Sequence, residues 1–190
     1  MGPAHRNLEL KAIDRDPGRS REICEGLGAE ARGVLRQKDT YFDVPRGRLK
    51  LRREGGAASQ LIAYQRSNDS SQRESRYRIV EVEDDIELEA ALAEALGIRA
   101  VVQKARRLFL YEGVRIHLDR VDDLGSFIEF EGVATQEDAD LGRFESLLAD
   151  LRHSLDIRDT DLIAGSYCDL VLASAARLAA NRGSVDGEVR

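Results

Sequence analysis

The sequence is poor in cysteine, with Cys24 and Cys168 as the only two in 190 residues. Two isolated thiols exclude the dense disulfide framework of small secreted domains, and they also exclude a metal site built from several thiolates. Each cysteine lies in a stretch with helical periodicity. We therefore interpret both as small hydrophobic residues of a buried core.

Long apolar runs are missing as well. No stretch of the chain stays apolar over the roughly 20 residues that a membrane-spanning helix needs. The segment from Met1 to Lys11 lacks the apolar core of a secretory signal. We expect a soluble, cytoplasmic protein without a membrane partner.

An excess of positive charge is the third missing feature, because 29 Lys and Arg face 35 Asp and Glu, for a net charge of -6. This balance argues against an open basic surface for nucleic acid, although an enclosed basic site for a polyanion remains compatible with it. Charged residues still make up 34% of the chain, above the average of about 25% in globular proteins. Some of this charge is therefore expected inside the fold.

Interdomain linkers and internal repeats are absent too, so we expect one domain over residues 1–180, followed by a disordered tail over 181–190. Alternation of apolar and polar residues predicts about eight strands, and helical periodicity predicts four helices, which together indicate an α+β fold. The predicted strands are Leu8–Ile13, Thr40–Val44, Arg48–Arg53, Gln60–Arg66, Ser75–Glu83, Val101–Leu110, Val114–Val121 and Ser126–Glu131. The predicted helices are Arg19–Leu27, Ile86–Leu96, about Asp138–Leu155, and Asp161 to about Ala180 after Thr160 as N-cap.

In these strands the alternation separates charged from apolar side chains. Three cations oppose two leucines in Arg48–Arg52, and Glu129 and Glu131 oppose Ile128 and Phe130. A sheet with one face in water would explain this pattern. Two details favour an enclosed charged face instead: several strands carry a single sign of charge, and the helices supply apolar stripes for the other face. If about eight strands close into a barrel, the charges line a hydrated bore.

Such a bore would suit a metal-bound polyphosphate. Grouped carboxylates favour a hard divalent cation such as Mg²⁺, which commonly bridges to substrate phosphates. Arg and Lys on the other walls would neutralise phosphate oxygens.

At this point the sequence resembles the CYTH superfamily, which includes the class IV (CyaB-type) adenylyl cyclases and thiamine triphosphatase. The resemblance covers about residues 5 to 172 and consists of eight segments in the order of the family. These segments are residues 7–11, 39–43, 47–52, 61–66, 102–107, 115–119, 124–131 and 166–170.

The resemblance implies a closed eight-stranded antiparallel β-barrel, with helices packed outside, that binds a triphosphate through Mg²⁺ or Mn²⁺. It implies a metal site made of Glu9, Asp119, Glu129 and Glu131. It implies a phosphate site made of Lys11, Lys50, Arg52, Arg66, Lys104, Arg106 and Arg115. The family's first strand reads Glu-x-Glu-x-Lys, whereas this chain has Asn7 at the first position, which weakens the case for a second tightly held ion.

The hydrolases of this family place a Lys and Tyr pair near the nucleophile, and the corresponding residues here are Lys11 and Tyr41. Tyr41 has an equally good structural interpretation, as a ring that packs at a strand end. His117 lies between Arg115 and Asp119 on the charged face, where it could move a proton or orient Asp119.

Our first functional hypothesis is a class IV adenylyl cyclase-like enzyme that converts ATP to cyclic AMP and pyrophosphate. An inorganic triphosphatase, a nucleoside triphosphatase or a thiamine triphosphatase would use the same phosphate and metal groups. A non-catalytic polyphosphate or nucleotide sensor is a third hypothesis, because Asn7 removes one acidic position. The resemblance also allows a homodimer, although no patch in the sequence demonstrates one.

Overall fold

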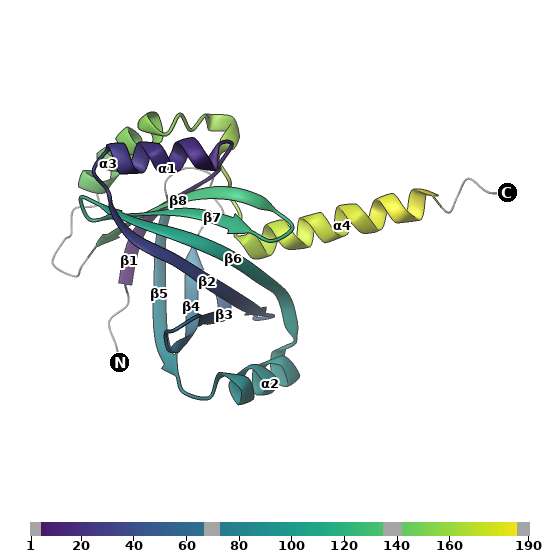
Figure 1. The fold of residues 1–190 in the computed structure, drawn as a ribbon. Helices are drawn as coiled ribbons and strands as arrows, with labels where there is room; N and C mark the ends of the chain where they lie inside the picture. Colours follow the sequence, from purple (N-terminus) through teal and green to yellow (C-terminus); the bar gives the residue numbers. More distant parts are fainter. Residues whose placement is uncertain (1–4, 67–72, 135–141, 186–190) are drawn as a thin grey trace.

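The computed structural model describes residues 5–66, 73–134 and 142–185, which form eight antiparallel strands and four α-helices (Figure 1). The predicted α+β class is confirmed. The strands are β1 (His5–Ile13), β2 (Glu30–Phe42), β3 (Arg48–Glu54), β4 (Ser59–Arg66), β5 (Arg73–Val82), β6 (Ile98–Tyr111), β7 (Val114–Val121) and β8 (Gly125–Ala134). The helices are α1 (Pro17–Gly26), α2 (Asp85–Leu96), α3 (Gly142–Ser154), the short 3-10 helix η1 (Asp159–Asp161) and α4 (Tyr167–Val185).

The strands form one strongly curled sheet in the order β1-β5-β4-β3-β2-β6-β7-β8. Strand β1 pairs with β5 along one edge and with β8 along the other. Each strand therefore has two hydrogen-bonded neighbours, and the sheet has a concave inner face and a convex outer face.

Tight hairpins fix the register of the strands that carry the charged residues. Strands β6 and β7 are joined by Glu112 and Gly113, whose φ angles are 48° and 86°. A two-residue hairpin with positive φ at both positions matches the right-handed twist of its strands. This turn brings Arg106 directly opposite Asp119 on the inner face.

The main hydrophobic core lies outside the curl. The outer faces of β1, β7 and β8 present apolar side chains to α1 and α3, which lie over these strands in Figure 1. Phe130 of β8, Ile116 of β7 and Leu148 of α3 are completely buried in this layer. Burial of the apolar side against helices leaves the charged side of the same strands to face inward.

A second apolar cluster closes one end of the curl. The N-terminal turn of α4 inserts Tyr167 and Cys168 against Val102, Val121 and Phe127. From there α4 extends away from the sheet (Figure 1). The first turn of α4 therefore covers this end of the concave face.

Helix α4 begins later than the sequence predicts. The segment after Thr160 forms only the short η1, and α4 starts at Tyr167. Ser166 is the residue that caps it: the Ser166 hydroxyl and backbone N–H both donate to Asp169 Oδ2 at 2.8 Å, and the Asp169 N–H donates to the Ser166 hydroxyl at 3.2 Å. Because this reciprocal cap satisfies the backbone groups at the helix start, α4 begins after Ser166 rather than after Thr160.

Strand β2 is longer than predicted, because it begins at Glu30 rather than at Thr40. Its first half does not alternate, and a register shift between Ala31 and Val34 interrupts its pairing with β6. The partner strand β6, rather than a local pattern, holds this half extended.

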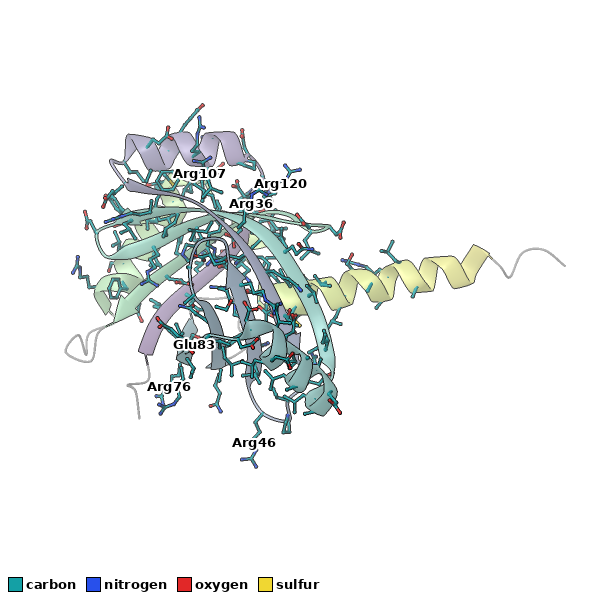
Figure 2. All side chains as sticks on the ribbon, turned by 60° about the horizontal axis from the view of Figure 1, so that its bottom comes forward. Arg36, Arg46, Arg76, Glu83, Arg107 and Arg120 are labelled. Carbon is teal, nitrogen blue, oxygen red and sulfur yellow. The ribbon has the colours of Figure 1, made fainter. Side chains whose placement is uncertain are left out.

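The outer face of the same region is also charged. Arg36, Arg107 and Arg120 lie close together outside β2, β6 and β7 (Figure 2), where their strands pair through Ala105.

Within the described ranges, no helix combines the length and the apolar character that crossing a bilayer requires.

Candidate functional site

The concave face encloses a cavity of about 350 Å³. Among the described residues, six Lys and Arg and four Asp and Glu line it. The cations are Lys11, Lys50, Arg52, Lys104, Arg106 and Arg115, and the acids are Glu9, Asp39, Glu129 and Glu131. An excess of cations at the wall of an enclosed site gives it a positive field for an anion, although the whole chain is acidic.

The structure brings most of the predicted site residues to this cavity. Tyr41 lines it together with nine of the charged side chains named from the sequence. Arg115 stands at its edge, with 47% of its side chain exposed. The side chains of Arg66 and Asn7 lie outside the part of the chain that is described.

Two Lys and Arg pairs are each organised by one buried aspartate. Asp39 of β2 accepts hydrogen bonds from Lys50 Nζ at 2.9 Å and from Arg52 Nε and Nη2 at 2.7 and 2.8 Å. The sequence analysis gave Asp39 no role. Because Asp39 lies two residues before Tyr41, extending the inward face of β2 by one step would have identified it.

Asp119 of β7 organises the second pair in the same way. It accepts from Lys104 Nζ at 3.0 Å and from Arg106 Nε and Nη2 at 2.7 and 2.6 Å. The Tyr167 hydroxyl adds a fourth donor at 2.9 Å. Asp119, which the resemblance implies as a metal ligand, thus also holds these two cations in place through both of its oxygens.

These contacts set the protonation states of the cavity. Burial alone would raise the pKa of Asp39, but the charges of Arg52 and Lys50 outweigh it and hold this pKa well below its ordinary value. Burial and the neighbouring Arg52 lower the pKa of Lys50 to about 7, even though Asp39 opposes this shift. Lys50 is thus a cation whose charge depends on pH near neutrality.

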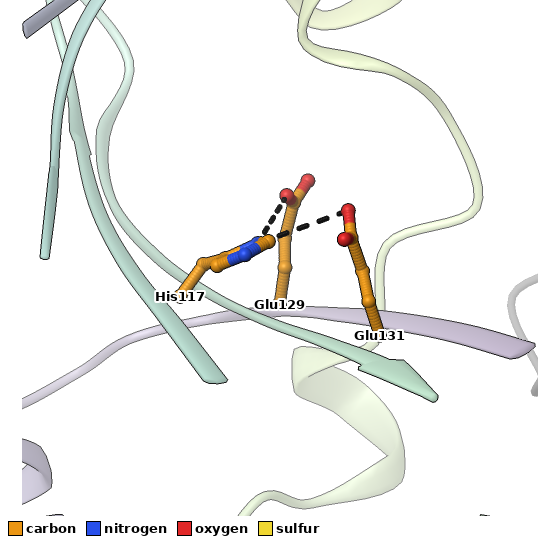
Figure 3. Close-up of side chains that lie close together, drawn as sticks. All are labelled: His117, Glu129 and Glu131. Carbon is orange, nitrogen blue, oxygen red and sulfur yellow. Dashed lines mark ion pairs between the residues drawn. The ribbon is translucent and has the colours of Figure 1, made fainter. Parts of the chain in front are cut away.

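A second group, at the wall of the cavity, has the composition of a metal site. His117 of β7 lies beside Glu129 and Glu131 of β8, and one ligand atom from each of the three lies within 4.8 Å of the others (Figure 3). His117 Nδ1 is 3.6 Å from Glu129 Oε2 and 3.8 Å from Glu131 Oε1. Glu9 of β1 pairs directly across from Glu131 and also lines the cavity.

This group fits a divalent cation. His117 Nδ1 is buried and has no hydrogen-bond partner among the described residues, and 3.6 Å is too long for a hydrogen bond to Glu129. Glu9 and Glu131 lie directly opposite each other on paired strands, where two like charges repel, and a cation bound beside them would reduce this repulsion. One imidazole and several carboxylates form a donor set that suits Mn²⁺ and also accepts Mg²⁺.

The sequence analysis placed His117 near Asp119, whereas its side chain lies beside Glu129 and Glu131. The β7–β8 hairpin sets His117 directly opposite Glu129. Counting residue pairs outward from the turn between β7 and β8 would have predicted that His117 lies opposite Glu129.

Lys11 lies between Glu129 of the candidate metal group and Tyr167, which donates to Asp119. Its Nζ is 2.9 Å from Glu129 Oε1 and 3.6 Å from the centre of the Tyr167 ring. Tyr41, the predicted partner of Lys11, instead has Lys50 Nζ 5.5 Å from its ring centre. Burial raises the pKa values of Tyr41 and Tyr167 well above the ordinary value, so both hydroxyls stay protonated.

Tyr167 is a second cavity residue without a role predicted from the sequence. From the sequence, its helix could either cap the tunnel or dock on the outside of the barrel, and Tyr167 lines the cavity. The Ser166-x-x-Asp169 cap is the signal that would have put Tyr167 at the start of α4, pointing into the cavity.

Comparison with known protein families identifies the family of this chain. The model of the CYTH domain matches residues 5–167, and this chain belongs to that family. Members of this family are generally triphosphate-processing enzymes, and they are typically metal-dependent. Comparison with curated proteins returned no match.

Solved structures share the fold at low sequence identity. The PH1012 protein of Pyrococcus horikoshii OT3 is 23% identical, with a TM-score of 0.75 over 86% of this chain and 98% of that chain. A candidate adenylate cyclase from Vibrio parahaemolyticus is 18% identical, with a TM-score of 0.71 over 89% and 99% of the two chains. The Schizosaccharomyces pombe Mediator head module contains a chain that is 10% identical, with a TM-score of 0.56 over 80% and 94%.

Proposed function

We propose that the curled sheet works as a closed tunnel in which a triphosphate binds with Mg²⁺ or Mn²⁺ and is cleaved. The observation that carries this proposal is the joint presence of six cations with Glu129 and Glu131 on one cavity of about 350 Å³, where His117 lies beside the two glutamates. The pairing of β1 with both β5 and β8 supports the closure of the tunnel.

The two aspartate-anchored pairs are the proposed phosphate clamps. Lys50 and Arg52 extend from β3, and Lys104 and Arg106 extend from β6. Asp39 and Asp119 each hold an Arg fork through two hydrogen bonds, which fixes its orientation before the substrate arrives. Preorganised donors of this kind stabilise charge that develops on phosphate oxygens.

His117, Glu129 and Glu131 would hold the metal, with Glu9 at the adjoining position on β1. A divalent ion bound there supplies charge neutralisation and orientation for phosphate oxygens. Lys11 lies 2.9 Å from Glu129. It can therefore place a positive charge next to phosphate oxygens that approach the metal ligands.

For the reaction, we propose cyclisation of ATP. The 3′-hydroxyl of the ribose loses its proton and forms a bond to the α-phosphorus, while the bridging bond to the β-phosphate breaks and pyrophosphate leaves. The candidate adenylate cyclase of Vibrio parahaemolyticus, which has the same fold, supports this choice at the level of the fold. Residues 47–52 and 115–131, which resemble the cyclase branch, supply five of the side chains at the cavity.

Hydrolysis of the terminal phosphate is the second candidate. The contact of Lys11 with the Tyr167 ring at 3.6 Å favours it, because a Lys and Tyr pair near the nucleophile characterises hydrolases of the family. In this reaction water forms the new bond to the γ-phosphorus, and the nucleoside diphosphate leaves.

Product analysis tests these choices. The chain is incubated with ATP and Mn²⁺, and cyclic AMP, ADP and AMP are separated. Cyclic AMP with pyrophosphate is the expected result, and ADP with phosphate alone would replace the cyclase by the hydrolase. Binding without any product would support a sensor, and an Asn7→Glu variant that gains turnover would strengthen that outcome.

Lys11→Met is the matched loss-of-function variant, since it removes the ammonium but keeps a chain of similar length. We expect it to lower turnover at least about tenfold. Lys38→Met, on β2 at a position whose ion pair is with Glu89 of α2, serves as the control.

A further inference from the structure

The charges of the cavity are unevenly distributed over its walls. They come from β1, β2, β3, β6, β7 and β8, whereas the side chains that β4 and β5 contribute are all uncharged in the described part of the chain. This uncharged wall consists of Gln60, Ile62, Tyr64, Ser75, Tyr77 and Ile79.

Two cross-strand pairs form the centre of the uncharged wall. Ile62 lies directly opposite Ile79, and Tyr64 lies directly opposite Tyr77. Ile79 keeps 42% of its surface exposed although it lines a charged cavity. Apolar surface left open beside a polar site is suited to an apolar part of a ligand.

An inorganic triphosphate would use this wall poorly. Each of its units carries charged oxygens, and oxygens that turned toward Ile62 and Ile79 would lose solvation without gaining a donor. A planar organic ring has the opposite requirement, since its faces favour aliphatic and aromatic surface. Gln60 and Ser75 add neutral donors and acceptors for the heteroatoms of such a ring.

The location of the wall also fits a substrate with two chemically different ends. Strands β6 and β7, which carry Lys104, Arg106 and Asp119, lie four places from β5 and β4 in the strand order. Of the two tyrosines, Tyr64 already has the cations of Arg48 and Lys50 at 5.8 and 5.9 Å from its ring centre. Tyr77 lies two residues from the exposed Ile79 on β5, and both line the cavity, so together they form one platform for a ring.

We infer that the β4–β5 wall is a base-binding subsite that selects an organic triphosphate, with a planar ring on Tyr77 and Ile79, over inorganic tripolyphosphate. This inference rests on the proposed function, because it requires the triphosphate part to bind at the Lys and Arg pairs. It assigns specificity to the uncharged side chains that β4 and β5 present to the cavity in the described part of the chain.

The test measures binding of α,β-methylene ATP and of inorganic tripolyphosphate, each with Mn²⁺, by titration calorimetry. The unmodified chain is expected to bind the nucleotide analogue about tenfold more tightly or better, as stacking on an aromatic ring contributes. Tyr77→Leu should weaken the analogue about tenfold and leave tripolyphosphate within about twofold, while Tyr77→Phe keeps both affinities.

A second pair of variants protects the test against misfolding of the Tyr77 variant. Ile79→Asn alters an exposed position of the wall, and Val80→Asn is its control, since Val80 is the next residue on β5 and is 58% exposed outside the cavity. Only Ile79→Asn should weaken the analogue, by about threefold or more, because it replaces apolar surface by an amide.

The outcomes separate the inference from the proposed function. If neither ligand binds, the triphosphate site itself is refuted, and the inference is refuted with it. If tripolyphosphate binds as tightly as the analogue, or if Tyr77→Leu affects both ligands equally, the base-binding subsite is refuted while the triphosphate site stands.

Discussion

At the scale of single residues, Asp39 and Asp119 decide how the cavity stays assembled without a ligand. Each is almost completely buried and neutralises one Lys and one Arg. Buried cations that lose a strong counter-ion are destabilised by desolvation that packing does not offset. The stability of the empty protein should therefore depend on these two carboxylates.

Replacing Asp39 by alanine should lower the free energy of unfolding by about 3–5 kcal/mol, because it leaves Lys50 and Arg52 buried without their counter-ion. Denaturant unfolding in low salt measures this loss. The control is Asp43→Ala, which breaks only an exposed pair with Arg99 and should cost less than about 1 kcal/mol. Equal effects of the two substitutions would contradict the anchoring role of Asp39.

The pKa of Lys50, lowered to about 7, predicts a pH dependence of binding. Above this pH the empty protein holds Lys50 largely neutral, and a triphosphate favours its charged form. Binding at pH 8 should thus take up to about one proton, and the affinity should fall as the pH rises through 7. Calorimetry in buffers of different ionisation enthalpy measures the uptake, and Lys50→Gln should abolish it; an undiminished uptake would place the proton elsewhere.

His117 predicts the metal preference. His117→Ala should weaken Mn²⁺ at least about tenfold and Mg²⁺ less, because an imidazole nitrogen contributes more to the softer ion. Electron paramagnetic resonance of free Mn²⁺ measures the first affinity, and competition by Mg²⁺ measures the second. His153→Ala changes an exposed histidine of α3 and should leave both unchanged. An equal loss for the two ions would contradict the predicted preference, and an unchanged affinity for both would remove His117 from the ligand set.

At the scale of elements, the docking of α3 on the sheet depends on one missing side chain. A Cβ at Gly132 of β8 would lie 2.6 to 2.8 Å from the Cβ, Cγ and Cδ1 atoms of Phe144, which is buried in the outer core. The strand can approach the helix this closely only because position 132 has no side chain.

Gly132→Ala should therefore destabilise the fold by about 1–3 kcal/mol through overpacking against Phe144. Gly26→Ala is the matched control, since a Cβ at the end of α1 meets nothing within 4 Å. That substitution should be neutral or stabilise by up to about 1 kcal/mol. Thermal and denaturant unfolding of both variants decide the matter, and a tolerated Gly132→Ala would show that α3 can shift.

The elements that the sequence predicts well are those in which charge and apolar character alternate. The inward positions of β3 and β8 follow directly from Lys50, Arg52, Glu129 and Glu131. The first half of β2 has no such alternation, since its extended form depends on pairing with β6, which is remote in the sequence. Asp39 received no role because the predicted strand began at Thr40, one residue too late, and the start of α4 at Tyr167 was placed too early.

At the scale of the whole molecule, the usual arrangement of a globular protein is inverted, with the hydrophobic core outside the curled sheet and the charges inside it. Two separate apolar clusters support one charged cavity. Substitutions in the outer core should thus change stability before they change the geometry of the cavity.

The internal aspartates have a consequence for how the substrate enters. Asp39 and Asp119 already give the arginines the negative partner that a phosphate would otherwise provide. These two aspartates supply the negative charge that a bound phosphate would otherwise supply. The cavity therefore keeps its shape without an anion from solution. A triphosphate would therefore meet Lys and Arg side chains that are already ordered. The entropy loss of ordering these side chains belongs to folding and not to binding.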